Sequence, residues 1–213
     1  MARKRVAILI SGRGSNMMAL IAAAKDQSYP AQIAIVISND PAAAGLQHAA
    51  DAGIATAVVD HKSFGKDREA FERALQRELD AKQIELVCLA GFMRLLTPAF
   101  VRRWDGRLLN IHPALLPAFK GLDTHARALA AGVKEHGATV HFVVPEMDSG
   151  PVIMQAAVPV QPGDTEATLA ARVLAVEHQI YPQALKLVAE GRVTIEGGRC
   201  LIDGRPAALA PPA

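Results

Sequence analysis

Two polar residues interrupt an apolar run in the stretch RLLNIHPALLPAFKG, residues 107–121. In an extended strand the side chains at positions i and i+2 point to the same face, so Asn110 and His112 would project together, roughly 6.6 Å apart along the strand. An amide N–H can stabilise an oxyanion, and an imidazole can move a proton near neutral pH. The pair therefore indicates a site that acts on a carbonyl group. The alternative is a strand-end histidine satisfied by a backbone carbonyl.

The segment SGRGSN, residues 11–16, is a second candidate site, because it follows an apolar run and precedes a helical pattern. Its glycines permit a tight turn, and Ser15 and Asn16 can cap the helix and present N–H groups to an anion. Met17 stands where a dinucleotide fingerprint has its third glycine, which disfavours a nicotinamide site. The segment predicts a phosphate site at this turn, and a capped helix without a ligand is the alternative.

The loop EMDSGP, residues 146–151, places Asp148 among turn-forming residues. An aspartate in such a loop often only caps a turn. The alternative is that it orients and charge-stabilises an imidazole. No spacing argument brings Asp148 next to His112, so the residues alone leave both interpretations open.

The elements that must position these side chains form an alternating pattern. Short Val/Ile-rich runs at 6–11, 32–38, 56–60, 84–92 and 107–112 alternate with helical patterns. This pattern predicts a Rossmann-like α/β fold with a mostly parallel twisted sheet flanked by helices on both faces. Asn39-Asp40-Pro41 and Thr97-Pro98 are typical helix starts. Pro113 and Pro117 should end the last strand and hold the following loop off the sheet.

The pattern changes after residue 137. ATVHFVV and PVIMQAAVPV, joined by the turn-prone PEMDSG, predict a strand–loop–strand excursion. A long helix is expected over about 165–190, and a small hairpin around Gly197-Gly198. The tail, 206–213, is expected to fray.

Composition and charge exclude several classes of function. Hydrophobic residues make up 51% of the 213 residues and charged residues 21%, which is typical of a globular chain. A net charge of only +2 and an aromatic content of 4% disfavour nucleic acid as a partner. Cys88 and Cys200 lie far apart and show no metal-ligand spacing, which is typical of cytosolic thiols. No segment approaches the ~18 apolar residues that a membrane span needs. We therefore expect a cytoplasmic protein.

Six segments together resemble a known family along essentially the whole chain: SGRGSN, LAGFMRLL, LLNIHPALLP, ATVHFV, MDSGPVI and EHQIYP. Their order and spacing resemble the folate-dependent phosphoribosylglycinamide formyltransferases. N-x-H-P followed at a distance by D-x-G is shared by the wider formyltransferase superfamily, while SGRGSN and the length narrow the match. The resemblance implies direct transfer of a formyl group from 10-formyltetrahydrofolate to the glycinamide amine in de novo purine synthesis, with no covalent enzyme intermediate and no metal.

The resemblance also implies roles for individual residues. Asn110 and His112 would stabilise the tetrahedral oxyanion, His112 would donate the proton, and Asp148 would favour the charged imidazolium. The ribonucleotide would be bound by Gly14, Ser15, Asn16 and Glu177. The folate would be bound by Arg68, Met93, Arg94, Leu95, Leu96, Asn110, Val144, Pro145, Glu146, Met147 and Asp148. Without the resemblance, Glu177 and Arg68 would be interpreted as solvated helix charges, and Met93 with its leucines as core.

We expect one formyltransferase domain over 1–213, with a ribonucleotide-phosphate half at about 1–104, a catalytic and folate half at about 105–205, and the frayed tail. Its partners would be the two small-molecule substrates, without nucleic acid or membrane, in a monomer or homodimer. Asp123 departs from the family pattern, because many relatives carry histidine there. His141, on an apolar strand, is expected to be a satisfied structural histidine.

Three other functions are weighed against formyl transfer to the ribonucleotide. Hydrolysis of 10-formyltetrahydrofolate could use the same three residues, but deformylases normally carry a regulatory domain that does not fit before Val6. Transfer to initiator tRNA would involve a C-terminal nucleic-acid domain, which is not expected after residue 205. A catalytically silent nucleotide-binding module is disfavoured because Asn110, His112 and Asp148 are all present.

Overall fold

The computed structural model describes residues 2–207 and 209–210. The chain divides into two compact units, Met1–Leu109 and Asn110–Ala213. The boundary falls inside strand β5 (Leu108–His112).

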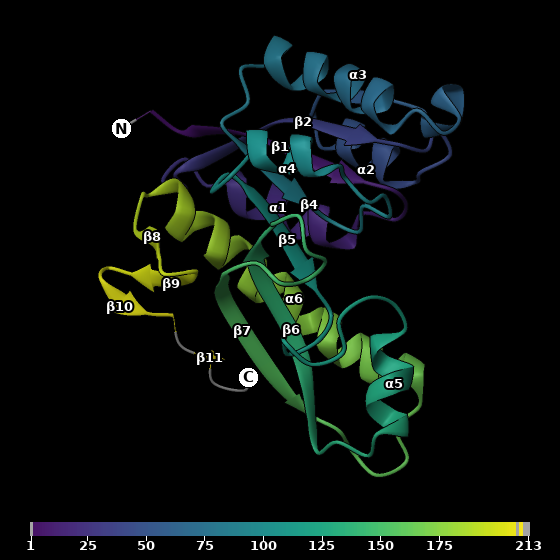
Figure 1. Ribbon diagram of the computed structural model, residues 1–213, viewed down its shortest axis with the longest axis vertical. Helices are drawn as coiled ribbons and strands as arrows, with labels where there is room; N and C mark the ends of the chain where they lie inside the picture. Colours follow the sequence, from purple (N-terminus) through teal and green to yellow (C-terminus); the bar gives the residue numbers. More distant parts are fainter. Residues whose placement is uncertain (1, 208, 211–213) are drawn as a thin grey trace. The chain divides into compact units, whose positions relative to one another are not determined.

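The first unit contains a parallel sheet with the strand order β4-β1-β2-β3. Its strands are β1 (Lys4–Ile10), β2 (Ala31–Ser38), β3 (Thr56–Val58) and β4 (Leu86–Leu89). Its helices are α1 (Ser15–Ala24), α2 (Gly45–Asp51), the 3₁₀ helix η1 (His61–Phe64), α3 (Arg68–Ala81) and α4 (Pro98–Arg103). In Figure 1, α1 and α2 lie on one side of β1 and β2, and α3 lies on the other side.

Strand β1, in the interior of this sheet, is a continuous apolar run in the sequence because both of its faces are buried. In β1, Val6–Ile10 are completely buried, because helices cover both faces. The strands expected in this part of the chain are all present, and the expected parallel sheet is confirmed.

One of the two predicted helix starts is wrong. Thr97 caps α4 as expected, because its side chain accepts from the backbone N–H of Phe100 and Pro98 occupies the first turn. The helix predicted after Asn39-Asp40-Pro41 begins only at Gly45. The Asp40 carboxylate instead accepts from Ala42 N at 2.9 Å and closes a turn, so this side chain competes with helix initiation.

The second unit is built on β6 (Glu135–Phe142) and β7 (Val152–Pro159), which pair antiparallel. The remaining elements are α5 (Thr124–Ala130), α6 (Glu166–Ala189), β8 (Val193–Glu196), β9 (Arg199–Ile202), β10 (Arg205–Pro206) and β11 (Leu209–Ala210). β8, β9 and β10 form a separate antiparallel sheet, and β11 pairs with β7. The strand–loop–strand excursion, the long helix and the hairpin are therefore confirmed.

The long helix α6 is held by its apolar stripe. Leu169, Val173, Val176 and Ile180 follow a spacing of three or four residues and are buried, and α6 contacts β6 and β7. Of the tail expected to fray, residues 208 and 211–213 lie outside the described residues, while Pro206 and Leu209–Ala210 belong to β10 and β11. In the described part of the chain no helix is long and apolar enough to span a membrane.

Candidate active site

Three side chains predicted from separate stretches of sequence meet in the second unit. Asn110 and His112 come from the end of β5, and His112 is buried, with 5% of its surface exposed. The Oδ2 atom of Asp148 lies 3.4 Å from Nδ1 of His112. The carboxylate thus lies where it can orient the imidazole and stabilise a positive charge on it.

Asp148 reaches this position because the loop between β6 and β7 folds back tightly. The loop is closed by a hydrogen bond from Phe142 N to Pro151 O at 3.0 Å. A Cβ atom at Gly150 would lie 1.8 Å from the carbonyl oxygen of Phe142, so only glycine allows this approach. Asp148 itself adopts the left-handed conformation, with φ of 48°, which aspartate tolerates better than bulkier residues.

The segment after Pro117 also holds Asp148. Gly121 N donates to Asp148 Oδ2 at 2.8 Å, and Lys120 Nζ donates to Ser149 Oγ at 2.6 Å. The oxygen that faces His112 is therefore also held by a backbone N–H. Asp148 is therefore held both by its own loop and by Gly121, which lies 27 residues away in the sequence.

His141 on β6 orients the amide of Asn110. Nδ1 of His141 lies 2.8 Å from Phe142 O, so this nitrogen carries the proton, and Nε2 is free to accept. Asn110 Nδ2 lies 3.3 Å from that Nε2. Burial lowers the pKa of His141 and so favours the neutral ring, although the carbonyl of Phe142 and the carboxylate of Asp148 oppose this effect. His141 is a satisfied structural histidine, as expected, and it leaves a second N–H of Asn110 for a ligand.

The other ring nitrogen of His112 is occupied by the protein itself. Nε2 of His112 lies 3.0 Å from the carbonyl oxygen of Phe119. Phe119 has φ of 52°, a conformation that a bulky residue adopts only under constraint. Any substrate that hydrogen-bonds to Nε2 must displace this carbonyl.

The loop after β5 is not held off the sheet, which corrects the sequence-based expectation. Its backbone is bound by two buried polar side chains, Thr139 on β6 and Gln155 on β7. Thr139 Oγ1 donates to Ala114 O at 2.6 Å and accepts from Leu116 N at 3.1 Å, while Gln155 Nε2 donates to Leu116 O at 2.8 Å. Since the backbone groups of this loop find partners on the strands, the loop packs onto them. Leu116–Pro117 is a cis peptide bond.

Two further histidines lie near His112. His136 is buried, with 1% exposure, and its ring packs edge-on against His125 and Phe119, at centroid distances of 5.2 and 5.8 Å. Neither ring nitrogen of His136 makes a hydrogen bond of ordinary geometry. Burial, together with the nearby His125 and His112, lowers the pKa of His136 to about 4. This ring is therefore neutral at physiological pH and is excluded as a proton donor there.

The predicted phosphate loop lies in the first unit, between β1 and α1. Gly14 has φ of 73° and is the N-cap residue of α1, so Ser15 begins the helix and does not cap it, contrary to expectation. Gly45 N donates to Gly12 O at 3.0 Å, and a Cβ at Gly45 would lie 2.9 Å from the same oxygen. This close approach of α2 holds the loop in place at the positive end of a ten-residue helix.

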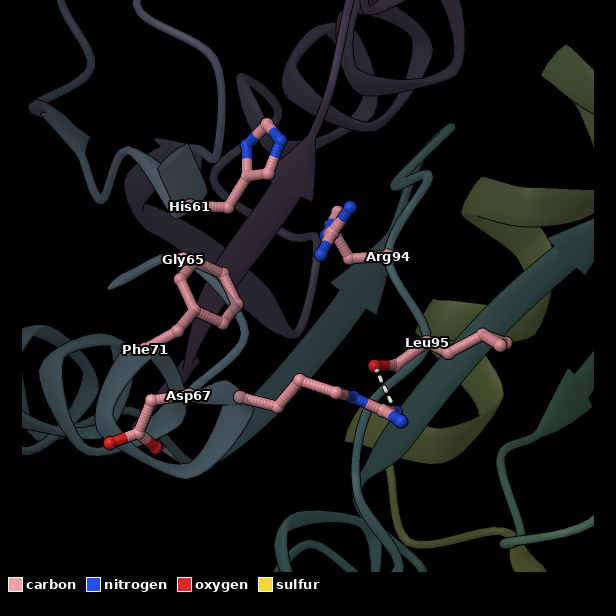
Figure 2. A pocket seen from close by; sticks show the side chains of 7 residues that line it. His61, Gly65, Asp67, Phe71, Arg94 and Leu95 are labelled. Atoms are coloured by element: carbon pink, nitrogen blue, oxygen red, sulfur yellow. Dashed lines mark hydrogen bonds between the residues drawn. The ribbon is translucent and has the colours of Figure 1, made fainter. Parts of the chain in front are cut away.

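The predicted folate residues of the first unit also lie together. Arg68, the first residue of α3, donates through Nη2 to Leu95 O at 2.6 Å (Figure 2). A small pocket beside this bond is lined by His61, Phe71 and Arg94, whose side chains surround it in Figure 2. Met93 and Leu95 are 68% and 70% exposed, so the interpretation of Met93 and the leucines as core is wrong for these two.

Glu177 and the folate residues of the second unit are the remaining binding residues predicted from the sequence. Glu177 lies on α6 with 7% exposure, so it is not a solvated helix carboxylate. Met147 is 56% exposed, and Pro145 and Glu146 are exposed as well, next to Asp148. Asp123, the departure from the family pattern, is exposed and has φ of 55°. Among the described residues no cluster of three or more His, Cys, Asp or Glu side chains could hold a metal ion.

Comparison with known proteins identifies a common set of relatives. The family model described as formyl transferase matches residues 4–185. The chain is 48% identical over 200 residues to phosphoribosylglycinamide formyltransferase of Escherichia coli, covering 94% of both chains. It is 52% identical over 198 residues to the trifunctional purine biosynthetic protein adenosine-3 of Bos taurus, covering 92% of this chain and 20% of that protein. The chain thus spans about a fifth of the trifunctional relative.

Solved structures agree with these matches. Phosphoribosylglycinamide formyltransferase of Coxiella burnetii, in complex with CHES, superposes with a TM-score of 0.92 at 43% identity, covering 99% of this chain and 100% of that chain. The predicted Rossmann-like formyltransferase fold is confirmed by this similarity. A formyltetrahydrofolate deformylase of Pseudomonas syringae is more distant, at 27% identity and a TM-score of 0.87, covering 94% of this chain and 66% of that one.

Proposed function

The chain belongs to the formyl transferase family, and from this premise we propose that it transfers the formyl group of 10-formyltetrahydrofolate to the amino group of N1-(5-phospho-D-ribosyl)glycinamide. The products are formylglycinamide ribonucleotide and tetrahydrofolate, and the reaction belongs to de novo purine biosynthesis. The resemblance to phosphoribosylglycinamide formyltransferases that the sequence shows is confirmed by the relatives named above. 10-Formyltetrahydrofolate is the formyl donor.

The observation that carries the proposal is the pairing of His112 with Asp148 beside Asn110. Nδ1 of His112 and Oδ2 of Asp148 are 3.4 Å apart, and both side chains are largely buried, with 6% and 12% exposure. A proton donor held by a carboxylate, next to an amide N–H, suits a reaction in which a carbonyl becomes a tetrahedral oxyanion.

The chemistry follows from these three side chains. The glycinamide amine attacks the formyl carbon, a C–N bond forms, and the carbonyl electrons move onto oxygen. Asn110 N–H and His112 stabilise this oxyanion. Collapse of the intermediate breaks the bond from the formyl carbon to N10, His112 gives N10 a proton, and the proton lost by the attacking amine restores the imidazolium. Asp148 holds the ring and its charge through both transfers.

Before this reaction, the carbonyl of Phe119 must leave Nε2 of His112. The segment that carries this carbonyl is joined to Asp148 through Gly121, so its displacement would also change the surroundings of the carboxylate. The substrate oxyanion would take the place of a neutral carbonyl acceptor on the imidazole. A charged acceptor forms the stronger hydrogen bond, which favours this exchange as the transition state develops.

The substrates are assigned to the remaining predicted residues. The backbone N–H groups of Gly14, Ser15 and Asn16 bind the ribonucleotide phosphate, since helix N-termini favour anions. Glu177 accepts hydrogen bonds from the ribose hydroxyls. The folate contacts the Met93–Leu96 segment largely through its backbone, the 144–148 loop, Asn110, and the guanidinium group of Arg68, which complements carboxylates. The buried position of Glu177 and the exposure of Met93 and Leu95 support these assignments.

We also propose the domain organisation, the cellular compartment and the oligomeric state of the protein. One formyltransferase domain of 1–213 contains a ribonucleotide half at about 1–104 and a catalytic and folate half at about 105–205. The protein acts in the cytoplasm, as a monomer or homodimer, on small molecules alone. Cys88 and Cys200 are buried thiols, which is typical of proteins in a reducing compartment. Sedimentation of the purified protein would decide between monomer and homodimer.

The test is an assay of purified protein with 10-formyltetrahydrofolate and glycinamide ribonucleotide that follows tetrahydrofolate release. Formyl transfer predicts release that requires the ribonucleotide and yields formylated ribonucleotide in equal amount. Release without the ribonucleotide would indicate a hydrolase acting through the same three residues. No release under either condition would indicate a silent nucleotide-binding module.

A further inference from the structure

The exposed segment Met93–Leu96 is held to the rest of the first unit by side chains. Arg68 holds the Leu95 carbonyl, as described above. The backbone N–H of Met93 donates to Oγ of Ser11 at 2.7 Å. Just after the segment, Glu72 of α3, which is 6% exposed, accepts from both the N–H and the hydroxyl of Thr97 at 2.5 Å. The segment therefore has anchors near its beginning, within it and directly after it.

Ser11 differs from the other anchors, because it also precedes the phosphate loop. It follows β1 and is joined directly to Gly12, the first glycine of that loop. Its backbone N–H donates to Gly91 O at 3.1 Å, while its hydroxyl accepts from Met93 N. One residue thus connects the loop assigned to the ribonucleotide phosphate with the segment assigned to the folate.

The hydroxyl of Ser11 has a fixed direction. It donates to Oδ1 of Asn39 at 2.5 Å, and a hydroxyl has only one proton, so a lone pair remains for the N–H of Met93. Asn39 is 5% exposed, and its backbone carbonyl accepts from His61 N at 3.3 Å and lies 2.8 Å from His61 Nδ1, while its side-chain Nδ2 lies 3.1 Å from the same Nδ1. Hydrogen bonds of the Ser11 hydroxyl therefore join Met93 to Asn39.

We propose that Ser11 is a positioning residue that couples the phosphate loop to the Met93–Leu96 segment, so that each substrate strengthens the binding of the other. This inference rests on the proposed function. Either ligand, when it orders its own segment, also holds Ser11 and orders the second segment. The second ligand then binds a site that is already ordered, which is positive coupling, and the effect is reciprocal.

The experiment measures ribonucleotide binding by calorimetry with and without saturating tetrahydrofolate, a pair that cannot react because no formyl group is present. Wild type is compared with Ser11→Ala, which removes the hydroxyl, and Ser11→Thr, which keeps it. Ser63→Ala is the matched control, since Ser63 is an exposed serine of η1. The KM for 10-formyltetrahydrofolate and kcat are measured for the same four proteins.

In wild type, Ser11→Thr and Ser63→Ala, tetrahydrofolate should lower the ribonucleotide Kd by about fivefold or more. In Ser11→Ala this enhancement should fall below about twofold, with the ribonucleotide Kd in the absence of folate close to that of wild type. The KM for 10-formyltetrahydrofolate should rise about fivefold in Ser11→Ala, with a smaller change in kcat.

Full enhancement in Ser11→Ala, or none in wild type, would overturn the coupling role of Ser11. A loss of ribonucleotide affinity that is equal with and without folate in both Ser11 variants would show a merely structural residue. Wild-type protein that binds neither ligand and releases no tetrahydrofolate would contradict the proposed function itself, and the inference with it.

Discussion

Asn110 Nδ2 lies 3.3 Å from Nε2 of His141, a histidine whose own Nδ1 is committed to a backbone carbonyl. The imidazole therefore offers a single acceptor, and the amide of Asn110 can turn only one of its two N–H bonds toward it. The other N–H is left pointing away from His141. A buried structural histidine thus sets the direction of the proposed oxyanion donor.

His141→Leu should lower kcat by about tenfold, because Asn110 loses the acceptor that orients its amide. The ribonucleotide Kd should change less than twofold. Steady-state kinetics and calorimetry measure the two quantities, and thermal unfolding of the same sample reports folding. His48→Leu, at an exposed position of α2, is the control. An unchanged kcat in folded His141→Leu would show that Asn110 needs no such orientation.

Asp148→Asn should lower kcat by about 100-fold or more, because an amide cannot stabilise the positive imidazole as a carboxylate does. Ribonucleotide binding, measured by calorimetry, should remain nearly intact. Asp123→Asn makes the same chemical change at an exposed residue with a similar left-handed backbone, so it should behave as wild type. Wild-type turnover by Asp148→Asn across the pH range would contradict the proposed role.

Acid should destabilise the fold through His136. Its pKa of about 4 in the folded protein lies below the ordinary value of 6.5, so the unfolded chain binds more protons between these pH values. The free energy of unfolding is then highest above about pH 6.5, decreases by up to about 3 kcal/mol as pH falls from about 6.5 to about 4, and levels off below that. Denaturant unfolding from pH 7.5 to pH 4 measures how the free energy of unfolding depends on pH.

His136→Phe should flatten this dependence, because the phenyl ring fills the same apolar site and does not titrate. His48→Phe, which changes an exposed histidine, should keep the wild-type slope. If the free energy of unfolding depended on pH equally in wild type and His136→Phe, groups other than His136 would be responsible for the acid sensitivity.

Gly14→Val should weaken ribonucleotide binding more than folate binding. Gly14 has φ of 73°, and a Cβ there would lie 3.0 Å from Cε of Met17 and 3.3 Å from the Cα of Gly45. The side chain would therefore both strain the backbone and push the phosphate loop away from α2.

Gly53→Val separates these two effects. Gly53 has φ of 75°, nearly the same conformation, but nothing lies within 4 Å of a Cβ added there. Its variant should lose stability to a similar degree while keeping ribonucleotide affinity. If Gly14→Val lost affinity for the ribonucleotide and the folate equally, general misfolding would be indicated.

Much of the fold could be predicted because its strands are locally encoded. Continuous apolar runs such as Val6–Ile10 are completely buried, and the i, i+2 spacing placed Asn110 and His112 together. The predicted helix start at Asp40 failed because a side-chain turn competes with helix formation there. The loop after β5 was also misjudged, since Thr139 and Gln155, which bind its backbone at Ala114 and Leu116, are ordinary strand residues in the sequence.

The groups that this protein has for chemistry, and the elements that carry them, follow from short stretches of the chain, since side-chain periodicity and capping depend on neighbours within a few residues. Which of these groups meet depends on contacts between distant stretches. The antiparallel pairing of β6 and β7 and the tight approach at Gly150 bring Asp148 to within 3.4 Å of His112, over a separation in sequence that no periodicity spans. The same holds for Ser11 and Met93, joined by one hydroxyl, because such contacts depend on how strands are ordered in the sheet.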